Sequence, residues 1–146
     1  MNIDQLREEL KVDEGCKYEI YLDHLGLPTF GIGHLVLPSD MEHGQPVGTP
    51  VSEDRVNECF AKDVETVLSE CAQLYSNFSV LPEEAQLIIA NMMFNMGRPR
   101  LSKFKGMKAA VDAGDYHRAA VEMVDSRWYQ QVTNRADRLV ARMRSI

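Results

Sequence analysis

Two acidic side chains, Glu14 and Asp23, flank the point where a helical pattern gives way to alternation and turn residues. We expect Glu14 at a helix end, Asp23 in a hairpin turn and Thr29 on the returning strand. Two carboxyl groups in unlike surroundings, one beside a hydroxyl, can split an acetal, because one protonates the leaving oxygen while the other activates water. Most acidic residues only solvate a surface, so the pair alone is weak evidence for catalysis.

The elements that would position this pair follow from the apolar pattern. Helical spacing predicts a first helix over residues 3–13, which ends at Gly15. Alternation then predicts a strand at 18–22, turn residues occupy 23–26, and residues 27–35 return as a second strand.

Helices dominate the rest of the chain. Residues 38–50 are rich in Pro and Gly and predict a loop. Ser52, followed by two acidic residues, predicts the start of a long helix that reaches about residue 72. Asp115 and Thr133 are predicted N-caps. Further helices are expected at about 82–96, 102–112, 116–125 and 134–145.

Composition excludes several classes of protein. The net charge of −6 argues against nucleic-acid binding, which depends on neutralising phosphates. Gly31-Ile32-Gly33 lacks the third glycine and the helix of a dinucleotide site. The four histidines have no metal-ligand spacing, so we expect neither a metal nor an organic cofactor. Cys16, Cys59 and Cys71 predict free thiols in a reducing compartment.

No apolar run is long enough to cross a bilayer, and the N-terminus has no signal-peptide pattern. We therefore expect synthesis in the cytoplasm and, for a substrate outside it, release or delivery by another assembly.

Short motifs identify a family. The first three are Asp13-Glu14-Gly15, Tyr21-Leu22-Asp23 and Thr29-Phe30-Gly31-Ile32-Gly33-His34-Leu35. Three more follow downstream: Asn91-Met92-Met93-Phe94-Asn95-Met96-Gly97, Ser126-Arg127-Trp128-Tyr129 and Asn134-Arg135-Ala136-x-Arg138. In order and spacing they closely resemble the T-even phage lysozymes, the endolysin muramidases of glycoside hydrolase family 24, over nearly the whole chain.

The resemblance implies an α+β, lysozyme-like fold in one domain, residues 1–146. It predicts a small β-containing N-terminal lobe (about 14–58), a connecting helix (52–72) and a helical lobe made of 1–13 and 73–146. It implies endo-acting hydrolysis of the β-1,4 bond between N-acetylmuramic acid and N-acetylglucosamine in peptidoglycan. The implied partner is the glycan strand, bound by a monomer.

The resemblance also assigns roles to residues. Glu14 is implied as general acid, Asp23 as the group that activates water, and Thr29 as its orienting partner. The family reaction inverts configuration. Arg135 matches an arginine that pairs with the catalytic glutamate, and His34–Asp63 matches a structural ion pair between strand and helix.

Leu35 and Phe94 match cleft-lining residues of the family. Gly33 is expected to let backbone approach the sugar, and Asn95 to offer an amide to the glycan or its peptide stems. Met107 and Glu122 stand where the family usually has a serine and an asparagine, so they would change subsite preference.

Three alternatives stay open. Asp23 could form a covalent sugar intermediate, or the chain could cleave without water, as lytic transglycosylases do. It could also be a silent wall-binding module, because its acidic charge departs from a family that is commonly basic and would weakly repel an anionic wall.

Overall fold

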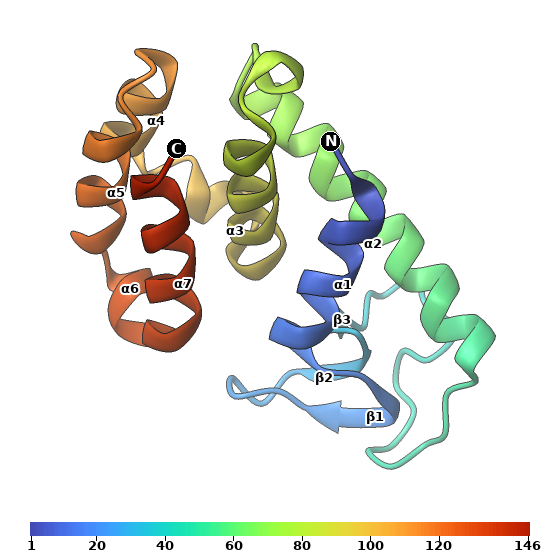
Figure 1. Ribbon diagram of the computed structural model, residues 1–146. Coiled ribbons are helices and arrows are strands. Elements are labelled where there is room, and N and C mark those ends of the chain that lie inside the picture. The colour runs from blue at the N-terminus through green and yellow to red at the C-terminus, as the bar shows by residue number, and fades with distance from the viewer. The chain divides into compact units, whose positions relative to one another are not determined.

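A computed structural model describes all 146 residues of the chain. Its helices are α1 (Ile3–Glu14), α2 (Glu53–Leu74), α3 (Glu83–Leu101), α4 (Lys105–Asp112), α5 (Tyr116–Val124), α6 (Arg127–Gln131) and α7 (Thr133–Arg144) (Figure 1). A 3-10 turn, η1, spans Phe78–Val80. The strands are β1 (Lys17–Leu22), β2 (Pro28–Gly31) and β3 (His34–Leu35). Seven helices with one small antiparallel sheet confirm the α+β class.

Contacts within the chain divide it into two units. The sheet unit is residues 7–66, and the helical unit is residues 1–6 with 67–146. The predicted lobe boundaries stay a prediction. None of the helices combines the length and apolarity that a membrane span requires.

The sheet unit is built around a three-stranded antiparallel sheet in the order β1-β2-β3. A register irregularity separates Lys17 from Tyr21 in β1. On the other edge of β1, backbone hydrogen bonds join Ile20 to Gly48 and Thr49, so the loop covers that edge. The buried core of this unit includes Leu10, Ile20, Phe30, Ile32, Val56 and Phe60.

The expected single strand over 27–35 is wrong, because a tight turn interrupts it between β2 and β3. Gly31 and Gly33 both have positive φ, +65° and +63°, which an extended strand does not allow. A Cβ atom at Gly31 would lie only 2.9 Å from Val56 of α2. The glycines therefore let the chain reverse while α2 packs closely on it.

In the helical unit, α7 contacts α3, α5 and α6 (Figure 1). Nearly every residue of α3 from Ala85 to Met93 is buried, so this helix is the centre of the core. Trp128 is also buried, at 2% exposure, and its ring meets Phe104 edge-on. This confirms that Trp128 packs the helical part of the protein.

The caps show where sequence patterns succeed and fail. Ser52 and Asp115 each accept a backbone N–H from three residues ahead, as N-caps do. Thr133 is not an N-cap: its hydroxyl donates to the carbonyl of Tyr129, because α6, which we did not expect, precedes it. The non-helical backbone of Gly97 (φ +76°) interrupts α3 just after its expected end at residue 96, and a further short helical stretch follows to Leu101.

Candidate active site

Glu14 is the last residue of α1, and Gly15 ends the helix with φ +74°. The Glu14 side chain is half-buried against the turn between β2 and β3. A Cβ atom at Gly33 would lie 2.8 Å from Oε1 of Glu14 and 3.2 Å from its Cβ. The carboxyl group of Glu14 thus fills the space that a side chain at position 33 would need. The sequence did not lead us to expect this contact.

Asp23 lies in the turn between β1 and β2, and one of its carboxylate oxygens organises that turn. Oδ1 accepts the backbone N–H groups of Leu25 at 2.8 Å and Leu27 at 2.9 Å. The turn is closed by the Asp23 N–H, which donates to the Leu27 carbonyl at 3.0 Å. Oδ2 has no hydrogen bond within the protein. The carboxylate is therefore held by one oxygen while the other can take a further partner.

Thr29 lies on β2 with only 4% exposure. Its hydroxyl donates to the carbonyl of Leu27 at 3.0 Å, so the backbone of Leu27 contacts both Asp23 and Thr29. Because the hydroxyl proton is used, Oγ1 can only accept from a further partner. In register, Thr29 is opposite Tyr21 on one side and Leu35 on the other, so these three side chains share one face of the sheet.

Tyr21 lies on β1, two residues before Asp23, and is in the electrostatic field of both candidate carboxylates. Burial raises its pKa, and the negative charges of Glu14 and Asp23 raise it further. The ammonium of Lys17 lies 4.3 Å from the centre of its ring. Tyr21 also lines an open hollow of about 630 Å³ between β1 and residues 47–50. We did not select Tyr21 from the sequence, although its strand position two residues before Asp23 was a usable signal.

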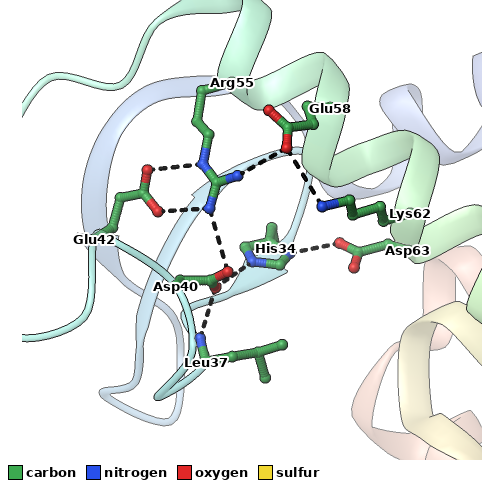
Figure 2. Close-up of polar contacts among 8 residues, drawn as sticks. All are labelled: His34, Leu37, Asp40, Glu42, Arg55, Glu58, Lys62 and Asp63. Carbon is green, nitrogen blue, oxygen red and sulfur yellow. Dashed lines mark hydrogen bonds and ion pairs between the residues drawn. The ribbon is translucent and has the colours of Figure 1, made fainter.

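His34, at the start of β3, confirms the expected pair with Asp63 and adds a second partner (Figure 2). Its Nδ1 is 2.7 Å from Asp63 and its Nε2 is 2.8 Å from Asp40. Burial alone would lower the pKa of His34, but hydrogen bonds to Asp63 and Asp40 raise it above its ordinary value. Asp40 also accepts the backbone N–H of Leu37 at 2.8 Å, which holds the chain just after β3.

Arg55 of α2 extends this network, as Figure 2 shows. It donates to Glu42 through Nε and one terminal nitrogen, both at 2.9 Å, and reaches Asp40 at 3.3 Å. The hydrogen bond from Arg55 lowers the pKa of the Glu42 carboxyl. The network therefore ties the loop after β3 to α2, close to Leu35, which is 44% exposed. We did not expect Asp40, Glu42 or Arg55 in this role.

The candidate residues of the helical unit have mixed surroundings. Asn95 accepts the indole N–H of Trp128 at 2.7 Å, which leaves its amide NH2 to donate. Phe94 is half-buried. Arg135 is 9% exposed and donates to Oδ1 of Asn91 at 2.8 Å. Its expected pairing with Glu14 stays a prediction.

Two residues of the helical unit are poorly suited to bind a glycan. Met107 has no exposed surface, because it belongs to the apolar face of α4. Its side chain supports the core instead of a binding surface. Glu122 accepts two hydrogen bonds from Arg118, at 3.0 and 2.6 Å, and fills the space beside Gly106.

A sequence model of the family described as phage lysozyme matches residues 11–145. The pre-baseplate central spike protein of Enterobacteria phage T4 is 28% identical over 152 residues, which cover 92% of this chain and 26% of that protein. A probable T4-type lysozyme of Dictyostelium discoideum is 28% identical over 161 residues, 95% of this chain and 93% of its own length. A peptidoglycan hydrolase of Pseudomonas phage phiKMV is 27% identical over 137 residues. These residues cover 94% of this chain and 15% of that protein.

Proposed function

The chain belongs to the phage lysozyme family, and we propose that it hydrolyses the β-1,4 bond between N-acetylmuramic acid and N-acetylglucosamine in peptidoglycan. The observation that supports this proposal is geometric: Glu14 packs against the turn at Gly33 that follows β2, while Asp23 and, at the start of the same strand, Thr29 both hydrogen-bond to Leu27. The substrate is an acetal with a poor leaving group. Its hydrolysis requires one group that protonates the leaving oxygen and another that activates water, and these residues offer both.

We assign Glu14 as the general acid that gives its proton to the glycosidic oxygen. Gly33 positions this group, because the turn leaves room for the carboxyl only where no side chain is present. From the helical unit, we assign Arg135 as the cation that holds Glu14 in place.

Asp23 and Thr29 act on the water. A water molecule that donates one proton to Oδ2 of Asp23 and the other to Oγ1 of Thr29 keeps a lone pair for the anomeric carbon. Both oxygens are suited to this role, because Oδ2 is unoccupied and the Thr29 hydroxyl proton is committed to Leu27. We propose inversion, which requires the two carboxyl groups to be roughly 6.5–9.5 Å apart, so that water fits on the far side of the sugar.

Leu35, Phe94 and Asn95 are proposed substrate contacts. Leu35 has the exposure for an apolar contact with a sugar face, and Asn95 has a free amide to donate. Glu122 is a weaker candidate, because Arg118 already holds its carboxylate. Met107 has no exposed surface and is not a proposed contact.

The test compares three variants on isolated peptidoglycan: Glu14→Gln, Asp23→Asn and the control Glu65→Gln, an exposed acid of α2. Removal of a general acid or base typically costs about 10²- to 10⁴-fold in rate. We expect Glu14→Gln and Asp23→Asn to lose activity by that order, and Glu65→Gln to keep it.

The products separate the rival reactions. Hydrolysis leaves reducing ends, whereas transglycosylation leaves 1,6-anhydro ends, one water lighter by mass spectrometry. Inversion gives the α-anomer first by NMR. Anhydro products, or full activity of Glu14→Gln, would overturn the assignment, and a wild type that binds peptidoglycan without cleaving it would indicate a binding module.

A further inference from the structure

Four cations follow one another where α3 leads into α4: Arg98, Arg100, Lys103 and Lys105. We call these residues the basic segment. All four side chains are exposed, and no acidic residue occurs between the first and the last of them. In a chain of net charge −6 this is a strong local excess of positive charge.

The charge of the basic segment is not neutralised within the protein. Arg98 donates to the side-chain oxygen of Gln73, and Arg100 donates to that of Gln131 at 2.9 Å. Both acceptors are neutral amides, which orient a guanidinium without cancelling its charge. Lys103 and Lys105 form no ion pair. Lys108, by contrast, is paired with Asp112 at 2.6 Å.

The backbone of the basic segment is held in place from inside. Leu101 is 1% exposed, and Phe104 packs edge-on against the buried Trp128, with 6.3 Å between ring centres. Both apolar residues of the segment therefore contact the core. The outer surface of the segment has no large, fully exposed apolar side chain to insert into a lipid bilayer, which argues against a membrane as the partner.

A fifth cation lies close by. Arg127 is exposed and lies four residues before Gln131, so the two share one face of α6. Gln131 is the residue that holds Arg100, which brings Arg127 to the same surface. Asp125, two residues before Arg127, is an acid on this side and limits the cationic surface there.

We propose that the basic segment binds the carboxylates of the peptide stems that peptidoglycan carries. This inference rests on the proposed function and names the part of the substrate that this surface contacts. An arginine fork matches a carboxylate in two hydrogen bonds, while lysine adds a mobile point charge. Such an attraction offsets the repulsion that an acidic enzyme meets at an anionic wall.

The test uses Lys103→Gln/Lys105→Gln in a Glu14→Gln background, so that the wall is not consumed. The side chains of these lysines form no hydrogen bond or ion pair, and their replacement leaves the hydrogen bonds of Arg98 and Arg100 in place. The control is Lys11→Gln/Lys62→Gln, which removes two exposed cations of the sheet unit and gives the same net charge. Binding to isolated sacculi is measured by co-sedimentation over a range of NaCl concentrations.

We expect the basic-segment variant to bind sacculi about fivefold more weakly than the parent, in line with the modest strength of exposed ion pairs. Its binding should also depend less on salt. The control should bind within about twofold of the parent. Equal binding by the two double variants would overturn the proposal.

Two further samples identify the anionic group. On sacculi stripped of their stems by an amidase, both variants should bind alike; a persisting difference overturns the stem assignment. A difference that appears on anionic phospholipid vesicles and not on sacculi overturns it as well. Hydrolysis by the wild type is measured separately, so an inactive wild type with a stem-dependent difference in binding contradicts the proposed function and supports this inference.

Discussion

The sheet unit and the helical unit have opposite charge. Residues 7–66 contain thirteen acidic and five basic side chains, whereas the helical unit contains nine acidic and eleven basic ones. The acidity of the whole chain therefore comes from the unit that holds Glu14 and Asp23. A net charge assigned to the whole protein conceals this division, and the expected repulsion from an anionic wall applies to one unit only.

The two units also use their ions differently. In the sheet unit, Arg55 and His34 form a partly buried network with carboxylates that holds a loop to α2. In the helical unit, the exposed pair Arg118–Glu122 joins neighbouring turns of one helix. Its core is mostly apolar, and the buried Arg135 there donates to the neutral amide of Asn91. The sheet unit is loop-rich, and its ion network holds one of these loops to α2.

Outside the proposed catalytic residues, the largest effect is expected at Gly33, where the sheet unit positions its acid. Gly33→Ala would put a Cβ atom 2.8 Å from Oε1 of Glu14. A misplacement of about 1 Å can cost roughly a hundredfold in rate, and we expect a loss of that order in peptidoglycan hydrolysis. The control is Gly26→Ala, because Gly26 also has positive φ, +78°, but has nothing within 4 Å of its would-be Cβ. Equal losses in both variants would assign the effect to backbone strain.

The next effect concerns stability. Arg55→Met leaves Glu42, which is 6% exposed, without its cation and leaves Asp40 with His34 as its only partner of this kind. Removing one partner of a buried ion pair costs roughly 3–5 kcal/mol in the free energy of unfolding. Arg118→Met breaks an exposed pair of the helical unit and should cost about 0.5 kcal/mol or less. Urea unfolding measures the loss of stability in each variant. Similar losses would contradict the expected difference between the ion pairs of the two units.

A smaller effect is the pH dependence that His34 brings to the sheet unit. The pKa of His34 is raised in the folded protein. Its contribution to the free energy of unfolding is therefore fully present below the pKa of the unfolded chain, about 6.5, and is lost as pH rises through the pKa of the folded protein. Asp40 and Glu42 have lowered pKa values in the folded protein. They stabilise it above the pKa of the unfolded chain, about 4, and this stabilisation is lost as pH falls through their folded pKa values.

We therefore expect the melting temperature to fall from pH 6 toward alkaline pH, and His34→Asn to flatten this fall. His117→Asn, at an exposed histidine of the helical unit, should leave the curve unchanged. An unchanged curve in His34→Asn would refute the assignment.

The smallest effect is a difference in thiol reactivity between the units. Burial raises the pKa of Cys59 in the sheet unit to about 11 and that of Cys71 in the helical unit to about 12. In a Cys16→Ser background, we expect Cys59 to react faster with a disulfide reagent, because Cys71 has no exposed surface and the charge of Arg55 favours the thiolate of Cys59. Faster labelling of Cys71 would show that the helical unit opens more readily.

Much of the local structure was predictable. The end of α1 at Gly15 and the caps at Ser52 and Asp115 depend on residues within four positions of one another. The split of residues 27–35 into two strands was missed, because alternation of apolar residues conceals the positive φ of Gly31 and Gly33. The short helix α6 was missed because its five residues are too few for a periodic pattern.

The sequence by itself determined the residue types available for chemistry, the motifs that show the family, and the turn in which Asp23 caps its own backbone. Only the tertiary structure decided that Glu14 fills the space at Gly33, that Arg55 joins Glu42 and Asp40, that Met107 is buried, and how charge is divided between the units. These contacts join residues that are distant along the chain. No local pattern encodes them, because their free energy arises only when helices and strands pack.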